Sequence, residues 1–379
     1  MRIGINALFW AQPATGSGQY VRQLVRHLAR MEHGLDLMLL APEYVPLDGA
    51  PAAAQPIPMQ VGPEGNRAKI LLEQWACPAA ARRHGADLLH VPYFAPPRVG
   101  RVPIVVTIHD LIPMLLPEYR GGLGVRAYTA WAAHAARHAD RIITDSEASA
   151  RDIERHLKVP PERVRVIYLA ADEVFRPVPP SEDGELTALR RRLGLPKDYL
   201  LYLGGFDRRK RVPELLRAYQ RAGLAQAGLA LVIGGRLPDA DTPFAPDPRP
   251  LAAELGIEDA VRCLGWVDEA DKPALYRGAR AFCFPSAYEG FGLPPLEALA
   301  SGTPVIAGRG SSLEEVVGPG GLLVTTDDLD ALTEALVRLA DDEALRARLG
   351  AQGLAHAATF RWETTAQETA ALYREVIDG

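Results

Sequence analysis

At 379 residues the chain is longer than one ordinary hydrophobic core, so we expect two domains. Its hydrophobic content of 48% and charged content of 23% are typical of a globular protein, and its net charge of −5 argues against nucleic acid as a partner. The cysteines, Cys77, Cys263 and Cys283, lie far apart and are odd in number, which predicts buried thiols in a reducing compartment, with neither a disulfide framework nor a zinc site.

The start of the chain and its hydropathy indicate where the protein works. Residues 1–7 show no charged segment followed by a long apolar stretch, so the sequence predicts no signal peptide. No uncharged apolar run reaches the roughly 18 residues that a helix needs to cross a bilayer. We therefore expect a cytoplasmic protein, with the inner face of the membrane as an alternative location.

In the first half of the chain, short apolar runs alternate with helical patterns. The predicted strands are residues 3–8, 35–40, 88–91, 104–108, 142–144 and 164–168. The predicted helices are residues 20–31, 68–83, 123–139 and 148–157, and the proline- and alanine-rich residues 48–63 are expected to form a loop. Apolar strands that alternate with helices are typical of a parallel sheet with both faces covered.

The second half repeats this alternation. Its predicted strands are residues 200–203, 230–233, 261–264, 281–284, 304–307 and 322–324. Its predicted helices are residues 186–193, 213–222, 251–255, 272–277, 293–300 and 313–317, and the proline-rich residues 239–250 are a predicted loop. Both halves are therefore predicted to be doubly wound α/β domains.

A cluster of prolines, Pro177, Pro179 and Pro180, marks the predicted domain boundary. We predict a first domain over residues 1–176 and a second over residues 177–361. The remaining residues, 362–379, carry an apolar stripe that needs a surface to cover it. A C-terminal helix is therefore expected to cross back to the first domain.

Two glycines, Gly16 and Gly18, follow the first predicted strand. They resemble part of the G-x-G-x-x-G dinucleotide fingerprint, but Val21 stands in place of the third glycine and no acid ends the second strand, which disfavours NAD. Two interpretations remain open. The glycines form either a loop that only caps the next helix or a loop whose N–H groups meet a ligand.

His109 follows the predicted strand 104–108 at its carboxyl end. In doubly wound sheets, ligands bind outside the carboxyl ends of the strands, and a histidine there can exchange hydrogen bonds with a ligand near neutral pH. The alternative is a histidine satisfied by the backbone, with Asp110 as a turn or cap residue. Its position favours the ligand-binding interpretation.

Two further stretches follow strand ends in the second half. After the strand 200–203 come Gly204 and Gly205 and then a basic run that includes Arg209 and Lys210, which can reach a phosphate if it is more than a solvated surface. After the strand 281–284 come Glu289, a glycine-containing loop, and a helix that opens on two prolines and carries Glu297. Free N–H groups at such a helix start suit an anion, and carboxylates beside them suit sugar hydroxyls. A loop that merely needs glycine is the alternative.

Metal-binding patterns are absent from the sequence. It has no C-x-x-C, no H-E-x-x-H, no Walker loop and no acidic pair at a strand end, so we expect no metal and no cofactor. The expected electrophile is a diphosphate whose charge is met by arginine, lysine and N–H groups.

Taken together, these segments resemble the retaining, nucleotide-sugar-dependent glycosyltransferases of family 4. The strongest match runs from Glu289 to Glu297, which fits the E-x7-E motif of that family with its Gly-Phe-Gly-Leu-Pro core. Further matches are residues 202–205 with Arg209 and Lys210, residues 144–147, residues 312–317, residues 360–362, and residues 109–110. The resemblance implies the GT-B fold, with two facing Rossmann-like domains, the first binding the acceptor and the second the nucleotide sugar.

The resemblance also implies a role for each matching residue. Arg209 and Lys210 would bind the donor diphosphate, Glu297 the ribose hydroxyls, and Glu289 would lie near the anomeric carbon. His109 would hydrogen-bond the sugar. The loop residues that would contact the sugar and phosphates are Gly205, Gly290, Phe291, Gly292 and Leu293, with Gly16 and Gly18 closing over the diphosphate. The implied reaction is a metal-independent, front-face substitution with retention.

Residues 109–113, 116–118 and 312–316 look most like those of mannosyl- and rhamnosyl-transferring members. This likeness implies GDP-mannose as donor and an oligosaccharide or lipid-linked acceptor. Residues 120–141 combine Arg126, His134 and Arg137 with Tyr128 and Trp131. They form either a solvated helix face, which is the favoured interpretation, or a peripheral contact with anionic lipid.

Two other functions fit a two-domain α/β chain. An epimerase of the UDP-N-acetylglucosamine 2-epimerase type shares the architecture and needs no acceptor. A non-enzymatic sugar-binding protein of the periplasmic kind also has two such domains, but the missing signal sequence and the cysteine pattern disfavour it.

Overall fold

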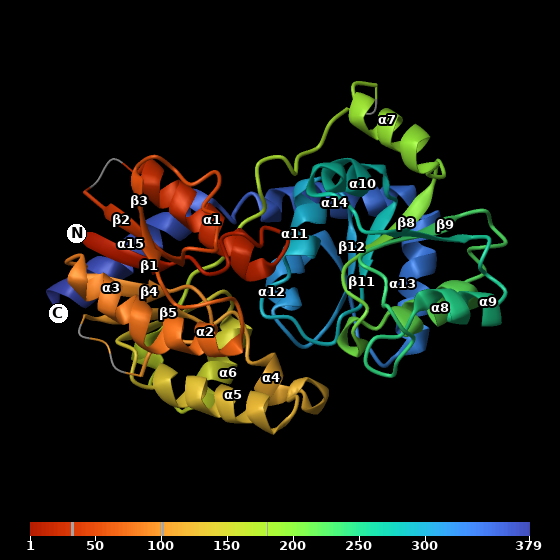
Figure 1. The fold of residues 1–379 in the computed structure, drawn as a ribbon. Helices are drawn as coiled ribbons and strands as arrows, with labels where there is room; N and C mark the ends of the chain where they lie inside the picture. Colours follow the sequence, from red (N-terminus) through yellow and green to blue (C-terminus); the bar gives the residue numbers. More distant parts are fainter. Residues whose placement is uncertain (32–33, 99, 101, 180) are drawn as a thin grey trace. The chain divides into compact units, whose positions relative to one another are not determined.

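The computed structural model describes residues 1–31, 34–98, 100, 102–179 and 181–379, and it divides into two compact units (Figure 1). The N-terminal unit comprises Met1–Leu169 and Arg361–Gly379, and the C-terminal unit comprises Ala170–Phe360. The predicted boundary after residue 176 lies a few residues later in the chain, and Pro180 falls outside the described residues. The α/β fold predicted for both halves is confirmed.

Side-chain contacts explain where the units divide. The Thr365 hydroxyl donates to the Tyr168 carbonyl at 2.6 Å, which ties the chain before the boundary to the C-terminal helix. Phe175, a few residues later, packs its ring against Tyr276 at 5.9 Å between centroids. The prolines from residue 177 onward therefore follow a segment that already packs on the C-terminal unit.

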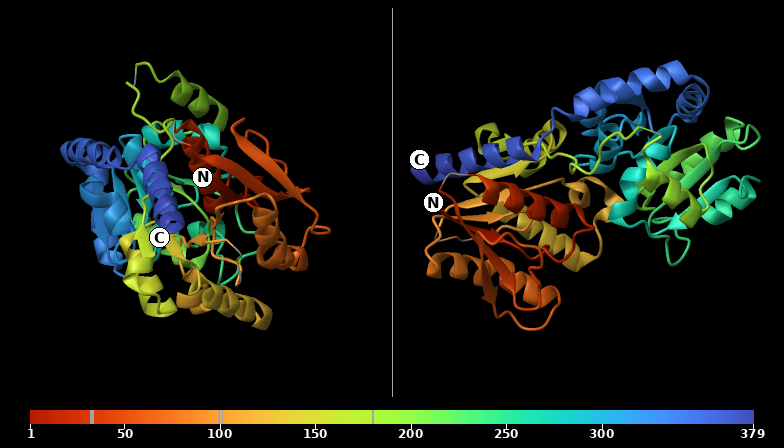
Figure 2. Two further views of the ribbon diagram at one scale, coloured as in Figure 1. Left: turned by 90° about the vertical axis from the view of Figure 1, so that its left-hand side faces the viewer. Right: turned by 90° about the horizontal axis from the view of Figure 1, so that it is seen from above.

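In its described residues the N-terminal unit has a seven-stranded parallel sheet of order β3-β2-β1-β4-β5-β6-β7. Its strands are β1 (Arg2–Asn6), β2 (Asp36–Pro42), β3 (Ala54–Met59), β4 (Leu88–Val91), β5 (Ile104–Thr107), β6 (Arg141–Thr144) and β7 (Val164–Val166). Its helices are α1 (Gly16–Arg30), α2 (Asn66–Leu71), α3 (Cys77–Arg83), α4 (Ile112–Leu115), α5 (Leu123–Ala136), α6 (Glu147–Asp152) and α15 (Trp362–Asp378). Figure 2 shows α15, in blue, against this unit, where it packs on α1 and β4.

The prediction that residues 48–63 form only a loop is wrong, because β3 lies within them. Pro56 and Pro58 pair in register with Leu39 and Ala41 of β2. A central strand hydrogen-bonds to a neighbour on each side, and proline has no N–H to donate to either. β3 is an edge strand whose neighbour is β2. The missing donors therefore leave no further strand without a partner.

Helix α1 begins at Gly16, earlier than the predicted start at residue 20. The Thr15 hydroxyl accepts a hydrogen bond from the Gly18 N–H at 3.2 Å, as an N-cap does. A Cβ on Gly18 would lie 2.0 Å from the Gln12 carbonyl oxygen, so the backbone packs too closely there for any side chain. The two glycines are therefore the first turn of the helix and not a loop before it.

The C-terminal unit has, within its described residues, a six-stranded parallel sheet of order β10-β9-β8-β11-β12-β13. Its strands are β8 (Tyr199–Leu203), β9 (Ala230–Gly234), β10 (Val261–Gly265), β11 (Ala281–Phe284), β12 (Val305–Gly308) and β13 (Gly321–Val324), and each overlaps a predicted strand. The central strands β8, β11 and β12 are buried along their whole length. This burial on both faces explains their continuous apolar sequences.

Eight α-helices accompany this sheet in the part of the chain that the structure describes. They are α7 (Gly184–Leu193), α8 (Val212–Arg221), α9 (Pro248–Glu254), α10 (Lys272–Gly278), α11 (Leu293–Ala300), α12 (Leu313–Val317), α13 (Leu329–Asp341) and α14 (Glu343–Ala357). Helix α9 begins inside the predicted loop 239–250, where Asp247 caps it by accepting from the Arg249 N–H. Helices α13 and α14 were not predicted. None of the described helices is both long and apolar enough to span a bilayer.

Candidate functional site

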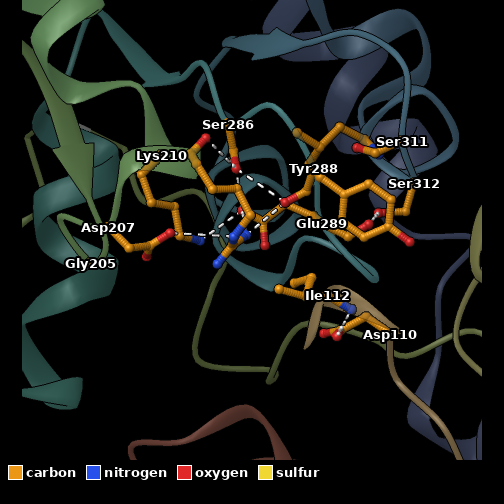
Figure 3. A network of polar contacts seen from close by, with 12 residues as sticks. Asp110, Ile112, Gly205, Asp207, Lys210, Ser286, Tyr288, Glu289, Ser311 and Ser312 are labelled. Atoms are coloured by element: carbon orange, nitrogen blue, oxygen red, sulfur yellow. Dashed lines mark hydrogen bonds and ion pairs between the residues drawn. The ribbon is translucent and has the colours of Figure 1, made fainter. Parts of the chain in front are cut away.

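In the C-terminal unit, a cluster of charged side chains lies beyond the carboxyl ends of two neighbouring strands, β8 and β11 (Figure 3). We use "charged cluster" for Asp207, Arg209, Lys210 and Glu289. Lys210 Nζ and Arg209 Nη1 both contact Glu289 Oε1, at 2.7 and 2.6 Å. Arg209 Nε lies 3.4 Å from Asp207 Oδ1. The structure thus brings together Arg209, Lys210 and Glu289, which the resemblance places at the diphosphate and near the anomeric carbon.

The two loops that carry the charged cluster are also joined through their backbones. The Ala287 N–H donates to the Arg209 carbonyl at 2.8 Å, and Arg209 Nη1 donates to the Tyr288 carbonyl at 2.6 Å. Lys210 is fixed from its other side, since its ammonium lies 4.7 Å from the centroid of the Phe284 ring. The cations are therefore held in place before any ligand arrives.

Burial and charge act in opposite directions on Glu289, whose side chain is only 12% exposed. Burial alone would raise the pKa of Glu289, but Lys210 and Arg209 outweigh it and hold the pKa below its ordinary value. The Ser286 hydroxyl adds a hydrogen bond to Oε1 at 2.5 Å. Glu289 is therefore an ionised carboxylate at neutral pH, with its charge balanced by the two cations.

Gly205 lies in the turn before the charged cluster, and its carbonyl accepts from the Tyr202 hydroxyl. The turn passes close to the neighbouring one, because a Cβ on Gly235 would lie 2.0 Å from the Gly204 carbonyl oxygen. Gly235 also has a φ of +146°, which favours glycine. Glycine is thus a packing requirement at residue 235, just past the end of β9.

The loop from Gly290 to Gly292 leads into α11, and Pro294 and Pro295 lie in the first turn as predicted. Gly292 caps this helix with a φ of +114°, and a Cβ there would lie 2.7 Å from Leu313 Cδ2.

The Ser312 hydroxyl lies 2.6 Å from the Phe291 carbonyl, to which it can donate. The Phe291 side chain is buried against Phe360. Packing from α12 and from the segment after α14 therefore shapes this predicted ligand loop, which Leu293 completes.

Glu297, the second glutamate of the motif, has a different environment from Glu289. It lies on α11, is 5% exposed, and its Oε2 accepts a hydrogen bond from the Tyr276 hydroxyl at 2.9 Å. Burial raises the pKa of Glu297 above its ordinary value, although Lys272 and the Tyr276 hydrogen bond oppose the shift. The structure therefore gives the two motif glutamates different partners and opposite pKa shifts.

In the N-terminal unit, His109 lies just past β5, with its Nδ1 2.6 Å from Asp145 Oδ2. Asp145 follows the neighbouring strand β6 and is almost fully buried. Burial alone would lower the pKa of His109, but the charge of Asp145 and its hydrogen bond outweigh it, so the pKa is raised. Nε2 of His109 and Oδ1 of Asp145 make no hydrogen bond to the residues that the structure describes.

A chain of uncharged polar groups lies beside this pair. The Tyr20 ring packs edge-on against His109 at 5.0 Å between centroids, and its hydroxyl is 3.1 Å from Thr107 Oγ1. His90 joins Thr107 at 2.8 Å and the Tyr373 hydroxyl of α15 at 2.6 Å. Burial and the charge of His109 lower the pKa of His90 to about 3, so His90 is neutral. The C-terminal helix thus contributes to the packing beneath His109.

Gly16 and Gly18 lie in the first turn of α1 and not in a loop before it. The Gly18 N–H is occupied by the Thr15 hydroxyl, while a Cβ on Gly16 would meet open space. Only Gly16 therefore leaves room beside the first turn of α1. Contact of either glycine with a ligand stays a prediction.

Among the described residues, no three His, Cys, Asp or Glu side chains are grouped to hold a metal ion. Independence from metals and cofactors remains a prediction. Sequence reasoning assigned no role to Asp145, Ser286 or Tyr276. Asp145 could have been found, because it follows a predicted strand end just as His109 does. Ser286 donates to Glu289 three residues later, so that contact is local in the sequence. The contact of Tyr276 with Glu297 depends on how two helices pack, and nothing local in the sequence indicates it.

Family models match both units of the chain. The model described as Glycosyltransferase Family 4 matches residues 14–174, and the one described as Glycosyl transferases group 1 matches residues 187–356. The O-antigen chain mannosyltransferase B of Escherichia coli is 31% identical over 377 residues, which cover 96% of each chain. The MMP alpha-(1->4)-mannosyltransferase of Mycolicibacterium hassiacum is 35% identical over 248 residues, or 64% of this chain and 56% of that protein.

Solved structures of similar fold extend over the whole chain. Sucrose-phosphate synthase from Thermosynechococcus elongatus has a TM-score of 0.78 and 26% identity, covering 100% of this chain and 99% of that one. The glycosyltransferase WaaG has a TM-score of 0.73 and 16% identity, covering all of both chains, and it supports the fold alone.

Proposed function

This chain belongs to glycosyltransferase family 4, and on that premise we propose that it transfers mannose from GDP-mannose to a saccharide or lipid-linked acceptor with retention of configuration. It is a transferase with the GT-B class of fold, with one doubly wound parallel sheet in each unit. Two mannosyltransferases among its relatives support the choice of mannose. The epimerase alternative receives no support from these relatives.

The observation that carries the proposal is the convergence of Arg209 and Lys210 on Glu289. In the proposed reaction the bond from the anomeric carbon to the diphosphate breaks and negative charge grows on the leaving oxygens. Cations that are already fixed stabilise this charge without reorganising, which favours the transition state over the bound donor. Glu289 holds both cations on one oxygen, so it sets the spacing at which they meet the diphosphate.

The other site residues complete the proposed binding of the donor. Glu297, on the same unit, accepts hydrogen bonds from the ribose hydroxyls while Tyr276 holds its other side. In the N-terminal unit, Asp145 fixes Nδ1 of His109, which leaves Nε2 to hydrogen-bond a hydroxyl of the transferred sugar. A leaving-group oxygen takes the proton of the acceptor hydroxyl, and the reaction needs no metal.

A nucleotide screen tests the donor. Thermal unfolding is measured with GDP, UDP, ADP and dTDP, each with EDTA, and then with the corresponding nucleotide sugars and a panel of saccharide acceptors. A ligand that binds only the folded protein adds about 2.7 kcal/mol to its stability at about 100 times its Kd. We expect GDP to raise the melting temperature most, because GDP-mannose is the proposed donor. NMR of the product should show the anomeric configuration of the donor.

The outcomes separate the parts of the proposal. Stabilisation by UDP in place of GDP would contradict the base, and loss of activity in EDTA would contradict metal independence. A product of inverted configuration would contradict retention. If no nucleotide stabilised the protein, the assignment of the charged cluster to a diphosphate would be wrong.

A further inference from the structure

A cavity of about 430 Å³ lies at one edge of the C-terminal sheet, and its lining comes mainly from β13 and α13. The lining combines apolar side chains such as Leu322 and Ala335 with three charged ones, Arg309, Glu334 and Arg338. A volume of this size and an apolar wall with a few charged groups are typical of small-molecule sites. None of these residues belongs to the charged cluster, so the cavity is a separate feature of this unit.

One face of α13 supplies two of the three charges. The lining residues of this helix are 331, 334, 335 and 338, and a spacing of three and four places them on one side of it. Glu334 and Arg338 are exposed, and neither forms an ion pair with any residue that the structure describes. Asp330, by contrast, pairs with Arg221 of α8. The fold therefore satisfies the neighbouring carboxylate and leaves the two charges in the cavity to solvent.

Arg309 reaches the cavity from the loop after β12. Its backbone N–H donates to the Val324 carbonyl at 2.8 Å, and its Nη2 donates to the Leu323 carbonyl at 3.3 Å. These two hydrogen bonds hold the guanidinium beside β13, an edge strand of the sheet. A guanidinium has five N–H donors, so the contact with Leu323 leaves others for an anion. Arg309 is therefore in place before any ligand arrives.

The loop that carries Arg309 also supports the predicted ligand loop. Three residues after Arg309, the Ser312 hydroxyl lies 2.9 Å from the Glu289 carbonyl and 2.6 Å from the Phe291 carbonyl (Figure 3). One end of this short segment thus lines the cavity, and the other contacts the backbone of the charged cluster. A ligand bound to Arg309 would act on that segment directly.

We propose that this cavity is an effector site for a sugar phosphate, and that its occupation strengthens nucleotide binding at the charged cluster. Arg309 and Arg338 suit the phosphate, because a guanidinium can donate two parallel hydrogen bonds to phosphate oxygens. Glu334 suits a sugar hydroxyl, which can donate to a carboxylate. The aliphatic lining suits the C–H face of the sugar ring, which gains from leaving water.

The coupling follows from the same contacts and rests on the proposed function. A phosphate bound to both arginines would tie the loop after β12 to α13. A nucleotide that then binds at the charged cluster loses less conformational freedom in residues 309–312, which gives positive cooperativity. Linkage requires that the nucleotide and the sugar phosphate change each other's Kd by the same factor.

Two other occupants fit less well. An extended peptide could add to the open edge of β13, but Arg309 Nη2 already occupies the Leu323 carbonyl. A second copy of the chain could pair Glu334 with Arg338 across a two-fold axis. That contact would bury the Arg309 guanidinium of each copy without a carboxylate partner, which is costly.

Isothermal titration calorimetry on the whole chain tests the site with mannose 6-phosphate, inorganic phosphate and mannose. The variants are Arg338→Glu, which reverses one charge of the cavity, and Ala331→Trp, which fills it. Arg348→Glu and Ala344→Trp are the matched controls, at exposed positions of α14. Circular dichroism of each variant checks that it is folded.

We expect mannose 6-phosphate to bind the wild type and both controls alike, inorganic phosphate to bind more weakly, and mannose not to bind measurably. Arg338→Glu should raise the Kd of mannose 6-phosphate roughly tenfold or more, as the loss of a hydrogen bond to a charged group does. Ala331→Trp should abolish binding by excluding the ligand. Saturating mannose 6-phosphate should lower the Kd of GDP roughly fivefold or more, and saturating GDP should lower that of mannose 6-phosphate by the same factor.

Several results would overturn the site. These are absence of mannose 6-phosphate binding, and equal loss in Arg338→Glu and Arg348→Glu. Loss in Lys210→Ala but not in Arg338→Glu would place the phosphate in the charged cluster instead. Concentration-dependent dimers in light scattering that Arg338→Glu abolishes would assign the surface to a second copy.

The coupling has its own test. Unchanged Kd values when both ligands are present would contradict it. If GDP failed to bind while mannose 6-phosphate bound as expected, the proposed function and the coupling would both be wrong, and the cavity would remain a sugar-phosphate site.

Discussion

The carboxyl ends of the two sheets use charge in different ways. In the C-terminal unit, Arg209 and Lys210 converge on one carboxylate oxygen of Glu289, so full charges balance one another. In the N-terminal unit, His109 pairs with Asp145 beside β5, and the Tyr20 and His90 rings that pack next to this pair are uncharged. The first arrangement suits a ligand that brings its own charge, and the second suits a ligand that brings hydroxyls.

This difference has a physical basis. A diphosphate that approaches two fixed cations gains charge-assisted hydrogen bonds without first ordering long side chains. A sugar hydroxyl needs one donor or acceptor in a fixed direction, which a histidine held by a buried carboxylate supplies. Variants that remove one group from each site should therefore fail in different ways.

The largest effect is expected from Lys210→Ala. Removing a preorganised cation from a developing phosphate charge should lower kcat/KM by roughly 100-fold to 1,000-fold, the range measured for single electrostatic donors in active sites. Glu289 keeps its contact with Arg209, so the fold should persist. Steady-state kinetics with a nucleotide-sugar donor measures the loss.

The matched control is Lys197→Ala, which removes an exposed lysine from the same unit. It should leave kcat/KM unchanged. If Lys210→Ala kept wild-type kinetics with the preferred donor, the charged cluster would be structural and the contrast between the two sheet edges would disappear.

The next effect concerns the pair in the N-terminal unit. Asp145→Asn weakens the partner of His109 Nδ1 and should lower kcat/KM by roughly tenfold. If Asp145 acts only by orienting His109, the double variant Asp145→Asn with His109→Ala should be no slower than His109→Ala alone. A double-mutant cycle measured over a range of pH gives the coupling.

Asp110→Asn is the control, because it removes another negative charge that raises the pKa of His109. Asp110 Oδ1 accepts from the Ile112 N–H at 2.9 Å, and asparagine can keep that hydrogen bond. A loss equal to that of Asp145→Asn would mean that general negative charge matters and the 2.6 Å contact does not.

The sequence predicted much of this contrast and missed some of its parts for identifiable reasons. His109, Arg209, Lys210 and Glu289 were predictable because each follows an apolar strand, and the carboxyl ends of parallel strands meet at one edge. Strand β3 was missed because Pro56 disfavours a central strand, and only the sheet order shows that β3 is an edge. The partners of Glu297 could not be predicted, since Tyr276 reaches it from another helix.

The helix start at Gly16 illustrates a local signal that was available. Thr15 precedes it and caps the helix, which is the residue type expected at that position. From the sequence, the two glycines could be interpreted as a ligand loop. In the structure, Gly18 is required because the Gln12 carbonyl leaves no room for a side chain. Backbone packing of this kind depends on the turn before the helix and cannot be seen in residue spacing.

The two motif glutamates allow a smaller effect to be tested through stability against pH. The pKa of Glu289 is lowered from its ordinary value of 4.5, so its stabilisation is present above that pH and is lost as the pH falls through the folded value. Glu289→Gln should therefore be less stable than wild type at pH 7, and the difference should shrink on acidification. Thermal unfolding from about pH 2 to about pH 8 measures both trends.

Glu297 should behave in the opposite way. Its pKa is raised from 4.5, so the folded state favours the protonated acid and wild-type stability falls as the pH rises through the folded value. Glu297→Gln removes that cost and can still accept the hydrogen bond from Tyr276. We expect its stability relative to wild type to increase with pH, and a parallel decrease for both variants would contradict the distinct environments.

The smallest effect is expected from Tyr373→Phe, at the end of the uncharged chain beside His109. The change removes the hydroxyl that lies 2.6 Å from His90 Nδ1, while the ring keeps its packing. Since a typical net hydrogen bond contributes about 1 kcal/mol, urea unfolding should show a loss of about that size. Stabilisation of the protein by the preferred nucleotide should not change, because α15 belongs to the N-terminal unit and the charged cluster to the other. Weaker nucleotide binding in Tyr373→Phe would mean that the two sheet edges are coupled and that the contrast between them is incomplete.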